Sequence, residues 1–99
     1  MFLFVALLLA APAAAVVINR VTVATTETLI YTAPVGGATV IVRNPGTVSV
    51  YLGPTGVLTT TGFELAAGDA MSIPMGSGDT LYGIVASGTN VVHTMEPRR

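Results

Sequence analysis

The sequence predicts an all-β fold: a small antiparallel β-sandwich or jelly-roll-like barrel of about eight short strands, preceded by an apolar N-terminal arm. After Ala15, short runs of β-branched residues alternate with turns rich in Gly, Pro, Asn and Asp, at intervals of roughly 8–12 residues. Few helix signals occur in this part. Because 52% of the residues are hydrophobic and only 9% are charged, the chain must bury apolar surface, which excludes intrinsic disorder.

The length of 99 residues leaves room for one domain. We divide the chain into an apolar arm over residues 1–15 and a single β-sandwich domain over residues 16–99. A domain of this size has a marginal core on its own, and this one carries few charges, so we expect partners to cover part of its surface. The sequence therefore predicts self-association, with a homotrimer as the preferred state.

The arm, MFLFVALLLAAPAAA, has no polar side chain and is shorter than the roughly 20 residues that a membrane helix needs. Its small-residue end resembles a signal-peptide cleavage site, which would make the protein secreted or periplasmic. However, no Lys or Arg precedes the apolar stretch, as a secretory signal normally requires. An uncleaved arm or a misassigned start codon are the alternatives, and we expect the segment to remain attached and to contact a neighbouring subunit.

The first half of the domain contains three predicted strands. Residues 17–25 alternate between valines and polar residues, as a half-buried strand does, although Asn19 interrupts the apolar face. A second strand covers residues 28–32. After the turn at residues 34–37, residues 39–43 are apolar on both faces except at their ends, which is typical of a central strand.

The second half begins with the turn signal Asn44-Pro45-Gly46, which predicts a hairpin leading into a strand over residues 48–52. The stretch from Gly53 to Gly62 is the longest irregular segment, and its threonines predict the most exposed loop. Pro74 marks its own strand as an edge or an end of a sheet. The remaining predicted strands cover residues 63–65, 71–75, 81–86 and 91–95.

Three groups of residues invite a chemical interpretation. Asp69 and Asp79 each follow a glycine and could suggest calcium ligands, but the further oxygens of a calcium loop are missing, so we favour hydrogen bonding within turns. His93, the single histidine, shares a strand face with Val91 and Met95 and is expected in the core or at an interface. The third group comprises the three tyrosines, which are expected to be structural rather than a recognition patch: Tyr31, Tyr51 and Tyr82.

The residue content argues against an enzyme. The chain has no cysteine and no lysine, and it lacks a nucleophile elbow and a phosphate-binding loop. We therefore assign no catalytic, cofactor-binding or metal-binding residue and expect no cofactor and no small-molecule substrate. A net charge of -1 with only four basic side chains offers no stripe for a phosphate backbone, so we expect no nucleic-acid partner, and we expect no membrane partner either.

From Thr28 onward, a series of turn and strand motifs resembles small bacteriophage virion proteins, which are β-sandwich or jelly-roll-like modules that decorate capsids or belong to tails, often as trimers. The motifs are Arg43-Asn44-Pro45-Gly46, Val48-Ser49-Val50-Tyr51-Leu52-Gly53, Gly62-Phe63-Glu64-Leu65, Ala67-Gly68-Asp69 and Gly78-Asp79-Thr80-Leu81-Tyr82-Gly83. The apolar arm is not part of this pattern, and the resemblance carries over no functional residue.

The resemblance implies a structural virion protein, namely a capsid decoration or cement subunit on the capsid surface of a phage head. Its expected partners are further copies of itself and the major capsid protein or other virion subunits. Two alternatives stay open. One is a tail- or fibre-associated module that binds a host receptor or glycan, and the other is a secreted β-sandwich adhesin.

Overall fold

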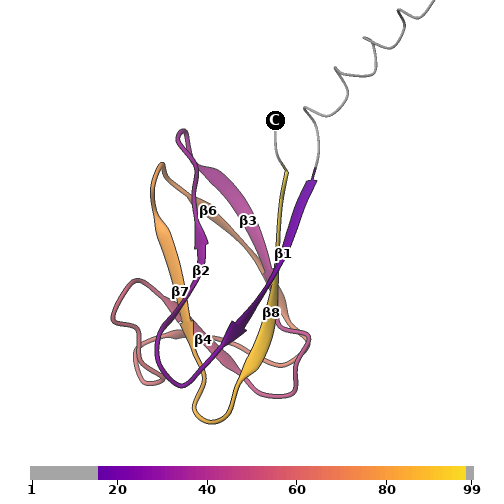
Figure 1. Ribbon diagram of the computed structural model, residues 1–99, viewed down its shortest axis with the longest axis vertical. Helices are drawn as coiled ribbons and strands as arrows, with labels where there is room; N and C mark the ends of the chain where they lie inside the picture. Colours follow the sequence, from indigo (N-terminus) through magenta and orange to yellow (C-terminus); the bar gives the residue numbers. More distant parts are fainter. Residues whose placement is uncertain (1–15, 98–99) are drawn as a thin grey trace, which may run out of the picture.

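The computed structural model describes residues 16–97, so every expectation about the arm of residues 1–15 lies outside the described residues. The fold is all-β, as predicted: eight strands form two four-stranded antiparallel sheets that pack as a small β-sandwich (Figure 1). Sheet A contains, in spatial order, β1 (Val16–Val23), β8 (Asn90–Pro97), β3 (Ala38–Arg43) and β6 (Ala70–Met75). Sheet B contains β2 (Thr28–Thr32), β7 (Thr80–Ile84), β4 (Val50–Gly53) and β5 (Phe63–Leu65).

Two predictions about strand position are confirmed. The strand that is apolar on both faces, β3, lies between β8 and β6 in the interior of sheet A. The strand that contains Pro74, β6, is an edge of the same sheet. Proline lacks the backbone N–H that an inner strand donates to its second neighbour, so the edge is where a sheet tolerates it.

The predicted hairpin at Asn44-Pro45-Gly46 is wrong. β3 belongs to sheet A and pairs with β6 and β8, whereas β4 belongs to sheet B and pairs with β5 and β7. The turn therefore carries the chain from one sheet to the other. Turn residues determine where the backbone reverses, but contacts between distant parts of the chain determine which strands pair.

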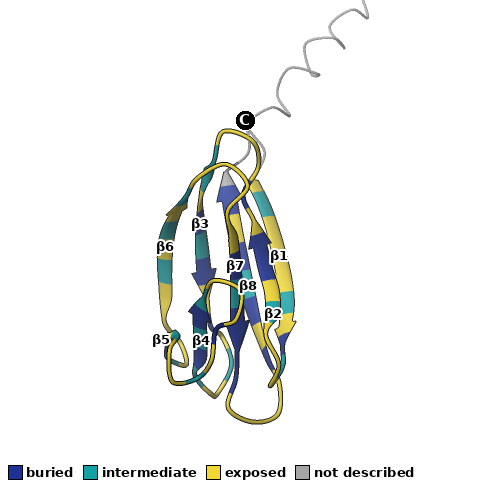
Figure 2. Ribbon diagram, turned by 90° about the vertical axis from the view of Figure 1, so that its left-hand side faces the viewer, coloured by how far each residue is buried: buried dark blue, intermediate teal, exposed yellow. Residues whose placement is uncertain are grey.

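The core lies between the sheets (Figure 2), and valine is its commonest residue. Alternate residues of each strand point inward, because successive side chains of a strand face opposite sides. The fully buried side chains from the two sheets include Val23, Val40, Val42, Val50 and Val92.

A buried pair of asparagines joins the two sheets at one end of the core. Asn44, fully buried just after β3, donates from Nδ2 to the carbonyl oxygens of Val48 (2.8 Å) and Leu65 (2.9 Å). Its Oδ1 accepts from the backbone N–H of Gly46 (3.0 Å) and from Nδ2 of Asn90 (2.8 Å), the first residue of β8. Asn90 also donates to the Val48 carbonyl (2.8 Å). These hydrogen bonds stabilise the turn that carries the chain from one sheet to the other, where the sequence predicted a hairpin.

Candidate interaction surface

The outer face of sheet A carries a row of apolar side chains that runs across three strands. Ile18 in β1 lies opposite Met95 in β8, and Met95 lies opposite Ile41 in β3. Val40 and Val42, which flank Ile41, point into the core, so Ile41 and the residues paired in its row, Met95 and Ile18, point outward. Ile18 is 60% exposed and Met95 is 38% exposed, although both are large hydrophobic residues. We call Ile18, Met95 and Ile41 the apolar row.

The adjacent row across the same strands is basic. Arg20 lies opposite His93, which in turn lies opposite Arg43. The Nε of Arg20 donates to Nε2 of His93 across 3.3 Å, so the imidazole accepts through that nitrogen. We call Arg20, His93 and Arg43 the basic row.

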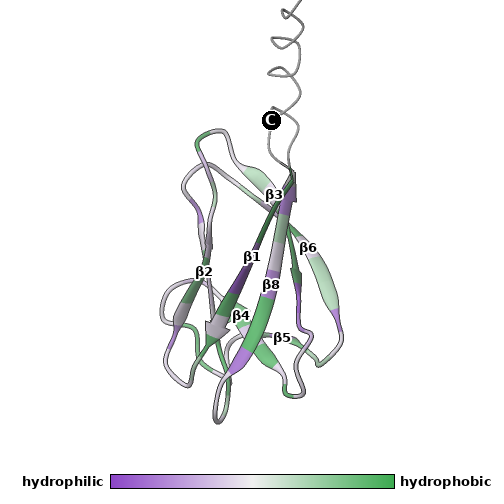
Figure 3. Ribbon diagram, turned by 45° about the vertical axis from the view of Figure 1, so that its right-hand side comes forward, coloured by the Kyte–Doolittle hydropathy of each residue, from purple (hydrophilic) through white to green (hydrophobic). Residues whose placement is uncertain are grey.

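A shallow hollow of about 220 Å³ lies where the two rows meet, and its lining includes Ile18, Ile41, Arg43, His93 and Met95. Figure 3 shows β1, β8, β3 and β6, the strands that form this face, with hydrophobic and hydrophilic stretches alternating along β1. An apolar floor beside guanidinium groups suits the surface of another protein, because interface centres are apolar and arginine is enriched at interfaces.

His93 occupies the outer face and is half-buried, so of its two expected placements the core is wrong, and the interface stays a prediction. It does share a face with Val91 and Met95, as predicted, but the opposite face of β8 is the buried one. That inward face carries Val92 and two polar residues, Thr94 and Glu96. Sequence reasoning missed both polar residues because the apolar residues of this strand occur on both faces.

The three tyrosines do not gather on one face. Tyr31 is buried in the core and lies opposite Leu81, whose side chain is also buried. Tyr51 and Tyr82 are half-buried on the other face of sheet B: Tyr51 lies opposite Ile84, two residues from Tyr82 in the same strand. A recognition patch made of all three rings is therefore excluded.

Asp79 shapes a turn, as predicted. Its Oδ2 accepts from the backbone N–H of Gly76 (2.9 Å), and its own N–H donates to the Gly76 carbonyl (3.1 Å). At Asp69 the bonds are backbone bonds: its N–H donates to the carbonyl of Ala66 (3.0 Å), and its carbonyl accepts from the N–H of Asn44 (2.8 Å). Among residues 16–97, no group of three or more His, Asp or Glu side chains could hold a metal ion.

The loop from Gly53 to Gly62 is mostly exposed, as predicted, but it is anchored to the domain. Val57 is buried, and its side chain packs against Gly53 and Gly62 at the two ends of the loop. The Glu27 carboxylate accepts from the Thr55 hydroxyl (2.9 Å) and from the backbone N–H of Gly56 (2.6 Å). The loop is thus an ordered surface feature of the described chain.

The part of the chain that the structure describes contains no helix with the length and hydropathy needed to cross a membrane. No protein-family model matches the chain, and no curated protein matches it. Among solved structures, the chain is similar to a protein of Bacillus endospore appendages, which form a family of disulfide-linked pili. The two share 18% identity with a TM-score of 0.45, over 86% of this chain and 89% of that chain. The likeness concerns the fold alone, and this chain has no cysteine with which to form a disulfide.

Proposed function

We propose that this protein is a structural subunit without enzymatic activity that works by packing the outer face of sheet A against other protein subunits. The apolar row is the observation that carries the proposal. Single exposed hydrophobic residues are ordinary on protein surfaces, but a continuous row bordered by cationic side chains is typical of an interface.

The energetics favour covering this face. Complete burial of a large aliphatic side chain contributes about 1.5–3 kcal/mol. Ile18 and Met95 are already partly covered, so a partner would gain on the order of 1 kcal/mol from each. Val16, 56% exposed at the start of β1, belongs to the same face and adds a similar amount. These gains are modest for one contact but accumulate in an assembly in which every subunit repeats it.

In its most specific form, the proposal is a capsid decoration or cement subunit of a bacteriophage head. The subunit would form a homotrimer, contact the major capsid protein and lie on the capsid surface. The series of turn and strand motifs from Thr28 onward supports this role, as does a sandwich that presents an apolar face on one sheet. The anchored, exposed loop from Gly53 to Gly62 would then face solvent at the outer surface of the particle.

The test compares two variants of the full chain in purified particles of the phage that encodes it. Ile18→Asp places a charge on the apolar row, whereas Leu58→Asp changes an aliphatic residue of similar exposure, 54% against 60%, in the outer loop. We expect quantitative mass spectrometry to find hundreds of wild-type and Leu58→Asp copies per particle and to find the Ile18→Asp chain strongly depleted. A chain that is absent from particles, or equal loss of both variants, would overturn the proposal.

The loop supports a second candidate, a tail- or fibre-associated module that binds a receptor or glycan. Thr55 and Thr60 are exposed there on an anchored backbone, which is how binding residues are commonly presented. Copy number separates the two roles, because a tail module is present in a few copies per particle. If the intact mass instead corresponds to a chain that begins near Val16, this would support a secreted adhesin.

A further inference from the structure

In sheet B, β7 lacks one of its two neighbouring strands over its first two residues. β4 pairs with β7 only from Tyr82 to Ile84, and the last pair is Gly53 with Tyr82. The chain then turns away at Pro54, whose carbonyl accepts from the N–H of Val57 (3.1 Å). On its other side, β7 stays paired with β2 as far as Thr80. The first two residues of β7, Thr80 and Leu81, therefore have a strand neighbour on one side only.

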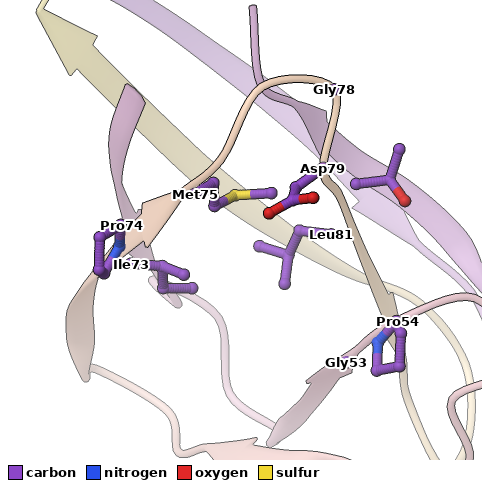
Figure 4. Close-up of a pocket in the computed structure, with 9 residues that line it drawn as sticks. Gly53, Pro54, Ile73, Pro74, Met75, Gly78, Asp79 and Leu81 are labelled. Carbon is purple, nitrogen blue, oxygen red and sulfur yellow. The ribbon is translucent and has the colours of Figure 1, made fainter. Parts of the chain in front are cut away.

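Sheet A continues past the point at which β4 ends. β6 pairs with β3 as far as Met75, and its inward side chains Ile73 and Met75 are only half-buried. Figures 1 and 2 show β4 confined to the lower end of the molecule. A hollow of about 530 Å³ occupies the place where β4 would continue, with Ile73 and Met75 on one wall and Leu81 on the other (Figure 4). We call this hollow the edge slot.

The edge slot extends along the open edge of the sandwich. A second hollow of about 210 Å³ shares Gly53, Ile73 and Leu81 with it and reaches Phe63 in β5, a phenylalanine that is 60% exposed. The second hollow also touches Met71, so the combined lining is predominantly apolar. The slot thus offers both an unpaired strand edge and an apolar floor.

These walls define the chemistry of an occupant. The one charged residue in the lining of the edge slot is Asp79, whose carboxylate lies beside Met75 and Leu81 (Figure 4). An extended segment could pair with the free edge of β7 and place alternate side chains against the floor, as in strand addition to a sheet edge. Because burying an acidic side chain beside Asp79 would be unfavourable, the segment should be apolar and free of carboxylates.

We propose that the edge slot binds an extended stretch of Met1–Ala15 from a second copy of this chain. That stretch is entirely apolar and has no acidic side chain, so it meets both requirements. The position of β1 favours a second copy as the donor: β1, which follows the segment directly, and β6, which borders the slot, are opposite edges of sheet A. If a segment of this composition stayed free, each Å² of apolar surface left in water would cost about 25 cal/mol of free energy.

Donor and acceptor are different surfaces, so the contact is heterologous, and such contacts close into rings or propagate as filaments. A three-membered ring would give the homotrimer of the proposed function. The inference uses neither the apolar row nor the basic row, and it therefore stands or falls separately from that proposal.

The absence of cysteine from the chain permits a clean cross-linking test. Full-length Leu7→Cys and Leu8→Cys proteins, whose new thiols would point to opposite faces of an added strand, are each mixed with full-length Met75→Cys under mild oxidation. Val35→Cys replaces Met75→Cys as the control, because Val35 is 96% exposed in the turn before β3, outside the slot. Docking raises the effective concentration of the two thiols near each other. With the donor whose thiol faces the slot, we therefore expect Met75→Cys to yield at least about tenfold more mixed dimer than Val35→Cys.

Equal yields from Met75→Cys and Val35→Cys, or no mixed dimer from either donor, would overturn the inference. If Met75→Cys fails to fold, Thr80→Cys serves instead, since Thr80 is exposed and lines the slot. Adding Ile18→Asp to both partners should leave the yield of mixed dimer unchanged. Loss of cross-linking in that background would contradict a slot contact that is independent of the outer face of sheet A.

Discussion

Replacing Asn44 by alanine should destabilise the domain more than any other substitution of a polar side chain in residues 16–97. The side chain is fully buried and makes four hydrogen bonds. After truncation, the Leu65 carbonyl and the Gly46 N–H lose this partner, whereas the Val48 carbonyl keeps its bond from Asn90. The two sheets then lose the polar connection at this end of the core.

The expected cost follows from these losses. A buried polar group left without its partner costs about 1–3 kcal/mol, so two such groups cost about 2–6 kcal/mol. The free energy of unfolding of a domain of this size is on the order of 4–12 kcal/mol. Asn44→Ala should therefore remove a large fraction of the stability or prevent folding at 37 °C. Asn19→Ala, at an exposed position in β1, should change stability by no more than about 0.5 kcal/mol.

Urea unfolding followed by circular dichroism, with all proteins at one concentration, measures the difference. We expect a much lower midpoint for Asn44→Ala with little change in the slope of free energy against urea. A midpoint for Asn44→Ala as close to wild type as that of Asn19→Ala would refute the role assigned to the network.

Three further outcomes are expected. The Cβ of Gly46→Ala would clash with Oδ1 of Asn90, so this variant should lose about 1–3 kcal/mol of stability, seen as a lower thermal midpoint. The midpoint should fall less for Gly76→Ala, whose Cβ would meet only the Asp79 carboxylate at 3.2 Å. Asp79→Ala should lose about 0.5–2 kcal/mol in chemical denaturation because the bond to the Gly76 N–H is removed, and Asp79→Asn, which keeps an acceptor, should restore most of it. A short epitope inserted after Thr60 should leave the thermal midpoint almost unchanged and bind antibody on intact assemblies; an epitope that folds but stays hidden there would show that the loop faces inward.

Local patterning predicted the strands well because strand periodicity is a property of neighbouring residues. The apolar run of β3 indicated a central strand, and Pro74 indicated an edge, since each signal reflects a local requirement of the strand. The pairing of strands was not predictable in this way. Asn44-Pro45-Gly46 is compatible with a hairpin or with a crossing between sheets, and the choice depends on Asn90, far along the chain.

The candidate surface was beyond sequence reasoning for a related reason. The apolar row combines Ile18, Ile41 and Met95, which the register of three strands brings side by side. In β8 both faces carry hydrophobic residues, so periodicity alone did not reveal that Val92 points inward and Met95 outward. The edge slot likewise arises from where β4 ends relative to β6, and no single segment of the sequence encodes that offset.

Sedimentation velocity of the full-length chain over a range of concentrations up to tens of micromolar tests most directly whether this protein works by packing against other subunits. The account predicts a mass well above the 10.1 kDa monomer, with the associated fraction rising with concentration. A monodisperse monomer at every concentration would contradict it.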